Sequence, residues 1–121
     1  MMLRALFTLI LLATPAAAGT AFHYYGAENC PPCRAFEREY LAGVRAIGAA
    51  DGFAVHEHRI PDLRQMPRPG VYGPADPLLR AALAMGGRPF PPVFFMTVDG
   101  AVISVHGADW AATLLAARDA E

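Results

Sequence analysis

The chain has 121 residues, of which 55% are hydrophobic, and this length is enough for one compact domain but too short for two. Its 10 basic and 11 acidic residues nearly balance, and no run of either sign stands out. The charge pattern therefore gives no indication of nucleic acid or an anionic membrane as a partner.

Residues 1–18 have the pattern of a secretory signal peptide. A basic start and an apolar run, Ala5 to Ala13, are followed by small residues that end at Ala18. A membrane span needs about 20 apolar residues, and this run is shorter. We expect cleavage after Ala18, a mature domain of residues 19–121 with no membrane span, and a location in a bacterial periplasm. Export also predicts that the two cysteines form a disulfide.

The first half of the domain is predicted to form a strand, a helix and a second strand. The aromatic run Thr20–Tyr25 is typical of a strand that ends at Gly26. A helix is expected from Pro31, since prolines are tolerated at a helix start. Its apolar residues recur at helical spacing, as Phe36, Tyr40, Val44 and Ile47. The alternating segment 53–60 predicts a second strand, and two strands joined by a helix form a parallel βαβ unit.

The next segment, 61–75, contains four prolines and two glycines and is predicted to be an irregular loop. Asp76 is expected to cap a short helix that stops at Gly86-Gly87. The apolar residues of this helix are Leu78, Leu79, Ala82 and Leu83.

The C-terminal part is predicted to form a hairpin and a helix. Val93–Val98 and Ala101–His106 are separated by Asp99-Gly100, which favours a tight turn. Asp109 is expected to cap the last helix, whose apolar face includes Trp110, Leu114 and Leu115. The order β-α-β-α-β-β-α predicts an α/β fold with a four-stranded mixed sheet flanked by helices.

Both cysteines lie at the predicted start of the first helix, as Cys30-Pro31-Pro32-Cys33. A thiolate attacks disulfides, and a helix N-terminus stabilises negative charge through its unpaired N–H groups and its dipole. Cys30 is therefore the expected nucleophile, and Cys33, one turn into the helix, is expected to be more buried and to resolve the mixed disulfide. Because neither proline has an N–H, mainly the Cys33 amide can donate to the Cys30 sulfur.

Two segments together resemble the thioredoxin superfamily. Tyr24–Cys33 is similar to its strand, loop and active site, and Pro92–Gly100 is similar to its cis-proline, strand and hairpin turn. The resemblance implies a thioredoxin-like fold and a thiol:disulfide oxidoreductase without cofactor or metal, in which Pro91 and Pro92 contact the substrate. The implied partners are a protein disulfide or dithiol and an upstream thiol electron donor. Since no histidine or other cation separates the cysteines, we expect a reductant or isomerase.

Two positions depart from the thioredoxin pattern. Asn29 stands where thioredoxins usually have tryptophan, and Tyr24 stands where they usually have a buried acid that helps to deprotonate the resolving thiol. Cys33 then needs another proton acceptor, for which water, His58 and Glu57 are the sequence candidates.

Other interpretations of the cysteine pair remain open at this stage. A structural disulfide is one, although a bridge that closes so small a loop restrains the unfolded chain little. The other is a metallochaperone-like protein that carries copper(I) on Cys30 and Cys33, or a four-ligand site completed by His56 and His58.

Residues 61–90 are not explained by the resemblance, because the spacing from the cysteines to the matching proline is longer than in thioredoxin. A long loop in a compact domain is usually functional or mobile. The segment is either an ordinary surface excursion or a rim that selects a partner, with Arg64, Arg68, Tyr72 and Arg88 as the rim residues.

Overall fold

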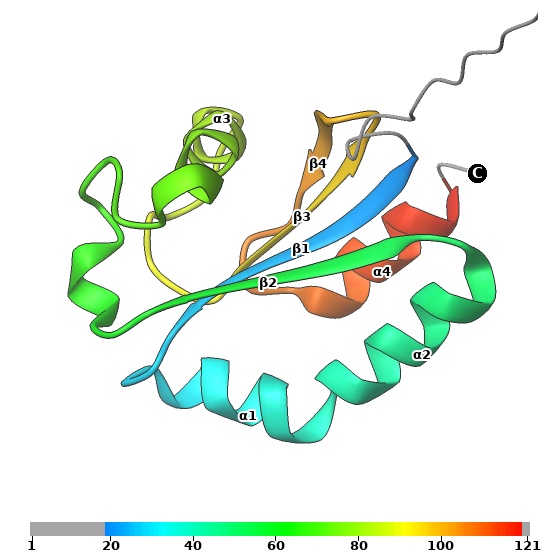
Figure 1. The fold of residues 1–121 in the computed structure, drawn as a ribbon, viewed down its shortest axis with the longest axis horizontal. Coiled ribbons are helices and arrows are strands. Elements are labelled where there is room, and N and C mark those ends of the chain that lie inside the picture. Colours follow the sequence, from blue (N-terminus) through cyan, green and yellow to red (C-terminus); the bar gives the residue numbers. More distant parts are fainter. Residues whose placement is uncertain (1–18, 120–121) are drawn as a thin grey trace, which may run out of the picture.

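Four strands form one mixed sheet at the centre of the computed structural model, which describes residues 19–119 (Figure 1). The strand order is β2-β1-β3-β4. β1 (Thr20–Ala27) pairs in parallel with β2 (Ala54–Ile60) and antiparallel with β3 (Val93–Val98), and β3 pairs antiparallel with β4 (Ala101–Val105). The predicted four-stranded mixed sheet is confirmed.

The helices lie on both faces of this sheet. α1 (Pro31–Glu39), α2 (Leu41–Asp51) and α4 (Trp110–Asp119) cover one face, which we call the α1 face, and α3 (Asp76–Ala84) lies on the other, the α3 face (Figure 1). This arrangement confirms the predicted α/β fold class and is compatible with the thioredoxin-like fold.

The predicted signal peptide, residues 1–18, lies outside the described residues. Within residues 19–119, no helix has both the length and the apolar composition that a membrane crossing requires.

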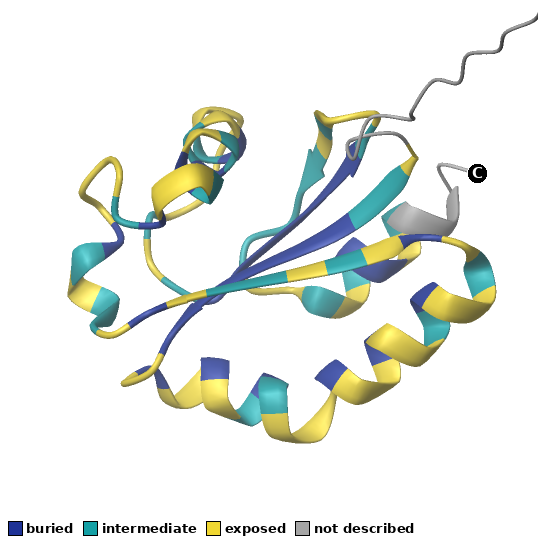
Figure 2. Ribbon diagram, in the orientation of Figure 1, coloured by how far each residue is buried: buried dark blue, intermediate teal, exposed yellow. Residues whose placement is uncertain are grey.

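β1 is a central strand and is buried on both faces. Tyr24 points to the α1 face, where its ring centroid lies 4.9 Å from that of Phe36. Tyr25 points to the α3 face, where its ring packs edge-on against Tyr72 at 4.9 Å. Figure 2 shows continuous burial along β1 and β3, whereas β2 at the sheet edge is mostly intermediate or exposed. The end of β1 that leads into the cysteine segment is therefore packed from both sides.

The sequence predicts one helix over residues 31–47, but the structure has two, because the helix is interrupted at Tyr40. Tyr40 has φ −127° and ψ −25°, and it separates α1 from α2. Its ring packs on Trp110 of α4, with centroids 4.5 Å apart, and the residue is 43% exposed instead of facing the sheet. The break changes the helical phase, so that Leu41 takes a buried position in α2.

Residues 61–75 are more regular than predicted. They contain two short 3-10 helices, η1 (Leu63–Gln65) and η2 (Gly73–Ala75). Met66 between them is fully buried in the core. Met66 and Tyr72 therefore anchor the segment to the domain, while residues 67–70 between them are exposed.

The sequence predicts Asp76 as the N-cap of α3, but Asp76 is the first residue of that helix. Its carboxylate turns back to accept hydrogen bonds from the Gly70 N–H at 2.6 Å and the Tyr72 N–H at 3.2 Å, and it pairs with Arg80 at 3.0 Å. Arg80 in turn donates to the carbonyls of Met66 and Arg68. Burial acts to raise the pKa of Asp76, but the hydrogen bonds from Arg80 and the two backbone N–H groups outweigh it and leave the pKa below its ordinary value.

His23 is the second buried titratable group on the α3 face. Its Nε2 lies 2.8 Å from the Thr97 hydroxyl, and its ring stacks on those of Phe95 and His56. Nδ1 is buried and has no hydrogen-bond partner among the described residues. Burial, with smaller contributions from His56 and His58, lowers the pKa of His23 to about 3. His23 is thus a neutral core residue at physiological pH.

The start of α4 follows the prediction, and the predicted apolar face is confirmed at Trp110 and Leu114 but not at Leu115. The Asp109 carboxylate accepts the Ala112 N–H at 2.9 Å, which confirms the predicted cap. Leu114 is buried, but Leu115 is 59% exposed, and Thr113 takes the second buried position. The helix is thus rotated relative to the predicted apolar face.

Candidate functional site

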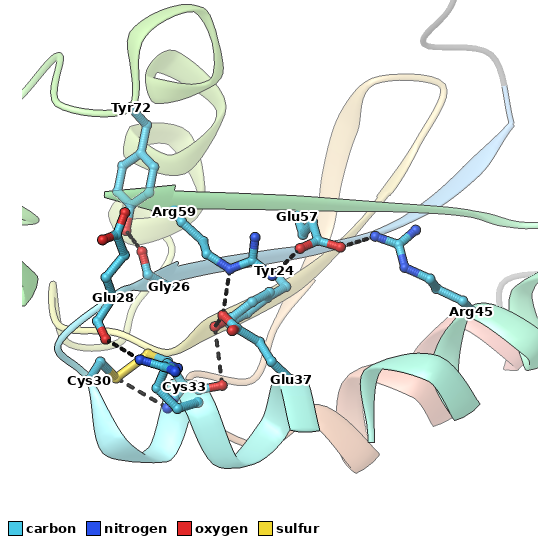
Figure 3. Close-up of polar contacts among 11 residues, drawn as sticks. Tyr24, Gly26, Glu28, Cys30, Cys33, Glu37, Arg45, Glu57, Arg59 and Tyr72 are labelled. Atoms are coloured by element: carbon cyan, nitrogen blue, oxygen red, sulfur yellow. Dashed lines mark hydrogen bonds and ion pairs between the residues drawn. A yellow bond between two sulfur atoms is a disulfide. The ribbon is translucent and has the colours of Figure 1, made fainter. Parts of the chain in front are cut away.

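Cys30 and Cys33 form a disulfide where β1 leads into α1 (Figure 3). Cys30 is the N-cap of α1 and has extended backbone angles, and the two intervening prolines occupy the first two helical positions. The Cys33 N–H points at the Cys30 sulfur over 3.2 Å, which confirms the predicted donor. The pair therefore sits at the positive end of the helix dipole, as expected from the sequence.

The sequence predicts that Cys33 is more buried than Cys30, but in the structure both cysteines are buried to the same extent. Cys30 is 1% exposed and Cys33 is 0% exposed, while Pro31 and Pro32 between them are exposed. In this disulfide form the helix places both sulfurs under the surface, so accessibility alone does not distinguish a nucleophile from a resolving thiol.

The segment before β3 lies beside this disulfide. The Pro91–Pro92 peptide bond is cis, and Pro92 is buried. Two surface pockets of about 330 and 230 Å³ meet here and share Pro32, Pro92 and Ala108 in their linings. The structure thus brings the predicted substrate residues, Pro91 and Pro92, into one pocket with Pro32, which lies between the cysteines.

The two pockets differ in what surrounds them. The larger is also lined by Arg88 and Phe90, and Phe90 is 48% exposed. Arg88 makes no hydrogen bond or ion pair with the other described residues. The smaller lies between α1 and α4, where Tyr40 and Trp110 form part of its wall. One pocket therefore offers an unpaired cation, and the other offers aromatic surface.

Asn29 ties the loop before the cysteines to the segment 61–75. Its side-chain oxygen accepts the Leu63 N–H at 2.7 Å, and its amide nitrogen donates to Asp62 over 3.2 Å. Hydrogen bonds from Arg64 and Asn29 hold the pKa of Asp62 well below its usual range. At the position where thioredoxins have tryptophan, this chain therefore has a polar tether.

Tyr72 does not belong to the predicted rim. It is buried, and its hydroxyl donates to the Gly26 carbonyl over 2.8 Å. Arg64 is engaged by Asp62, whereas Arg68 and Arg88 are exposed. Of the four predicted rim residues, the one that lines a pocket beside Pro91 is Arg88.

A polar cluster lies under the first turn of α1, on the α1 face (Figure 3). The Tyr24 hydroxyl donates to Glu37 Oε2 over 2.6 Å and lies 3.4 Å from the Cys33 carbonyl oxygen. Arg59 of β2 donates to the same Glu37 oxygen over 2.7 Å. The chain therefore places an acid beside the cysteines, but the acid comes from the helix and not from the strand.

Gly26 makes room for this cluster. A side chain on Gly26 would collide with the hydroxyl of Tyr24, which leans along β1 toward the cysteines. Glu37 was not among the residues predicted from the sequence, whereas Tyr24 was. The sequence signal for Glu37 is the combination of a tyrosine at the acid position, a glycine two residues later and a glutamate one turn after Cys33.

Neither side-chain proton acceptor named from the sequence contacts the turn that carries Cys33. Glu57 pairs with Arg45 of α2 and with Arg59. His58 packs against Tyr25 at 4.6 Å and therefore lies on the α3 face, with the sheet between it and α1. The four-ligand metal site is also wrong, since no group of three or more His, Cys, Asp and Glu residues within the described residues is placed to hold a metal ion.

Neither a family model nor a curated protein matches this chain. The strand order and the Cys30–Cys33 pair are compatible with a thioredoxin-like fold.

Proposed function

We propose that the protein is an exported thiol:disulfide oxidoreductase that reduces or isomerises protein disulfides through Cys30 and Cys33. The observation that carries this proposal is the placement of the disulfide at the N-terminus of α1, with the Cys33 N–H directed at the Cys30 sulfur over 3.2 Å. A donor in that position and the helix dipole both favour the thiolate of Cys30 over the thiol.

In the reductive direction, the Cys30 thiolate attacks one sulfur of a substrate disulfide, and the other substrate sulfur leaves as a thiolate. Cys33 then loses its proton and attacks the Cys30 sulfur. The bond between Cys30 and the substrate breaks, and the second substrate thiolate leaves. Two electrons have passed from the cysteine pair to the substrate, and an upstream thiol donor restores the reduced pair.

The direction follows from the donors around Cys30. Pro31 and Pro32 have no N–H, and no cation lies between the cysteines. The thiolate is therefore stabilised less than in strongly oxidising pairs, which have a lower thiol pKa. A less stabilised thiolate makes the dithiol a better electron donor, so the proposed direction is reduction or isomerisation.

The surface around the disulfide fits a polypeptide substrate. Pro91 and Pro92 share a pocket with Pro32, and a second pocket continues past Pro92 toward Trp110. Pro91 has a carbonyl but no N–H, so an extended substrate segment gains one backbone hydrogen bond there instead of two. Side chains of the substrate then contribute more of the specificity.

The decisive measurement is the reduction potential of the Cys30–Cys33 pair in glutathione buffers. We expect a value within the range of reducing and isomerising pairs, between about −270 and −180 mV. A value below about −300 mV would identify a structural disulfide instead. Copper(I) bound by the two thiols, without turnover of a disulfide substrate, would favour a metal carrier.

Trapping assigns the roles of the two cysteines. A Cys33→Ser variant should accumulate mixed disulfides with substrates in periplasmic extract, because the resolving thiol is missing. The matched control, Cys30→Ser, should trap little. If both variants trapped equally on non-reducing gels, the assignment of Cys30 as nucleophile would be lost.

A further inference from the structure

We propose that Glu37 takes the proton of Cys33 during the resolving step and that Tyr24 is the positioning residue that holds the Glu37 carboxylate for this role. The inference rests on the proposed function, since it concerns the second half of the same thiol exchange. It assigns an acid–base group to a site whose strand position, occupied by acids in thioredoxins, carries Tyr24.

The helix brings Glu37 close to the thiol. Cys33 and Glu37 are four residues apart in α1, and Cβ atoms at this spacing lie about 5–6 Å from each other. The Tyr24 hydroxyl touches both residues, at 3.4 Å from the Cys33 carbonyl and 2.6 Å from Glu37 Oε2. These contacts place the carboxylate beside the turn that carries Cys33, and the proposal is that it takes the thiol proton from there, directly or through one water.

Glu37 is largely buried but retains contact with solvent. Its side chain is 15% exposed, which allows proton exchange with solvent after each cycle. Cys33 itself is fully buried, so its thiol has little direct access to bulk water. A base at the boundary between the buried thiol and solvent meets both requirements of a proton acceptor.

Tyr24 cannot be the acceptor itself. Burial, and then the hydrogen bond to Glu37, raise the pKa of Tyr24 far above its ordinary value, so the phenol stays protonated at working pH. A protonated phenol donates to the carboxylate and fixes its place. Gly26 leaves the space through which this phenol reaches the helix.

The charged groups around Glu37 define an alternative role, in which Glu37 acts on the Cys33 thiolate through its charge alone. From β1 it meets the neutral Tyr24 phenol, and from β2 it meets Arg59, which is itself bound by Glu57. On its own helix, Cys33 lies one turn before it, and the adjacent Arg38 is exposed and pairs with Glu39. If Glu37 acted only through its charge, its removal would leave Arg59 to stabilise the Cys33 thiolate and would speed the attack. If Glu37 accepts the proton, its removal slows the attack.

The Cys33 proton moves to Glu37 as the Cys33 sulfur attacks the Cys30 sulfur of the mixed disulfide. The Cys33–Cys30 bond forms, and the Cys30–substrate bond breaks. The leaving substrate thiolate takes up a proton, and Glu37 returns its proton to solvent.

The two halves of the exchange can be timed separately with DTNB and the reduced protein. Attack by Cys30 releases the first nitrothiobenzoate, and attack by Cys33 on the resulting mixed disulfide releases the second. At pH 7 we expect Glu37→Gln to slow the second release at least tenfold, because general bases typically contribute about 10²–10⁴-fold. The first release should stay within about twofold of wild type, and the difference should close at about pH 10, where the thiol ionises unaided.

Three variants complete the test. Glu37→Asp should recover part of the second rate, and Tyr24→Phe should slow it about threefold, since one hydrogen bond that positions the carboxylate is lost. Glu39→Gln is the control, because Glu39 is an exposed acid of the same helix that pairs with Arg38. It should leave both releases unchanged.

The outcomes separate the two proposals. A second release that is unchanged or faster in Glu37→Gln overturns the role of Glu37, and so does one that is slowed equally at every pH, which indicates a merely structural effect. In either case a normal first release leaves the proposed oxidoreductase intact. If wild-type protein releases no nitrothiobenzoate at all, the proposed function falls, and the role of Glu37 falls with it.

Discussion

The two faces of the sheet both bury charged or titratable side chains, yet only one of them connects these groups to the cysteines. On the α1 face, Glu37 is linked through Tyr24 to the Cys33 turn and is partly open to solvent. On the α3 face, Asp76 is bound by Arg80 and by two backbone N–H groups, and these partners belong to α3 and to the segment before it. Burial of a charge is therefore not a sign of chemistry by itself. The groups that the charge contacts decide between catalysis and stability.

The largest expected effect tests the structural role of the α3 face. Asp76→Ala removes the acceptor of Arg80 and of two backbone N–H groups, and the loss of one partner of such a buried pair costs about 3 kcal/mol of the free energy of unfolding. Urea titration of the oxidised protein measures this loss. The reduction potential should stay at its wild-type value, and a shift of both quantities would mean that the two faces are not separate.

His23 gives the α3 face a pH dependence. Burial lowers its pKa in the folded state to about 3, against about 6.5 in the unfolded chain, so between these values the unfolded state binds the extra proton. The contribution of His23 to stability is therefore present above about pH 6.5 and is lost as the pH falls toward 3. We expect a loss of about 3 kcal/mol between pH 7 and pH 4 from this residue, since each pH unit below 6.5 contributes about 1.4 kcal/mol.

The matched variant for this prediction is His23→Phe, which keeps the ring stack with His56 and Phe95. Its free energy of unfolding should change less with pH than that of wild type over the same range. His56→Gln, at an exposed position of β2, should keep most of the wild-type slope, because His56 contributes less than burial to the lowered pKa of His23. Equal slopes in all three proteins would contradict the assignment of this pH dependence to His23.

A substitution at Pro91 tests how a substrate segment is bound next to the cysteines. Pro91→Ile supplies a backbone N–H for an extended substrate and leaves Pro92 in place. One net hydrogen bond is worth about 0.5–1.5 kcal/mol, so reduction of insulin disulfides should become up to about tenfold faster. The rate must be compared in protein with an unchanged circular dichroism spectrum. An unchanged or lower rate in such a variant would remove this explanation of the proline pair.

Arg88 should have the smallest effect, because it is exposed and solvent weakens its attraction for a substrate charge. For a peptide disulfide with an acidic residue near its cysteine, we expect Arg88→Gln to lower kcat/KM about threefold. A peptide with lysine in place of the acid is the control and should show no loss. Equal losses for both peptides would assign Arg88 to the structure of the pocket wall instead of to recognition.

The fold was largely predictable from local signals. The turn at Asp99-Gly100 and the cap at Asp109 both appear where the sequence places them, because each depends on residues close in the chain. The break at Tyr40 was not predictable in this way. No proline or glycine marks it, and the ring that holds Tyr40 belongs to Trp110 on the last helix.

The candidate site likewise has features that depend on residues close in the chain and features that depend on tertiary packing. The cysteine spacing, the helix start and the Cys33 donor follow from the motif itself. The link from Tyr24 to Glu37 depends instead on how closely α1 approaches β1 and on the absent side chain at Gly26. The helical period places Glu37 one turn after Cys33, but only the packed structure identifies its partners.

Trp110 is the only tryptophan in the chain. It lines the pocket that Pro32 and Pro92 also line, and its ring packs on Tyr40. Indole fluorescence responds to the polarity around the ring and to groups that quench it, so its emission is expected to change when a peptide enters this pocket. The wild-type protein thus carries its own optical probe, and substrate affinity can be measured on it without any added label.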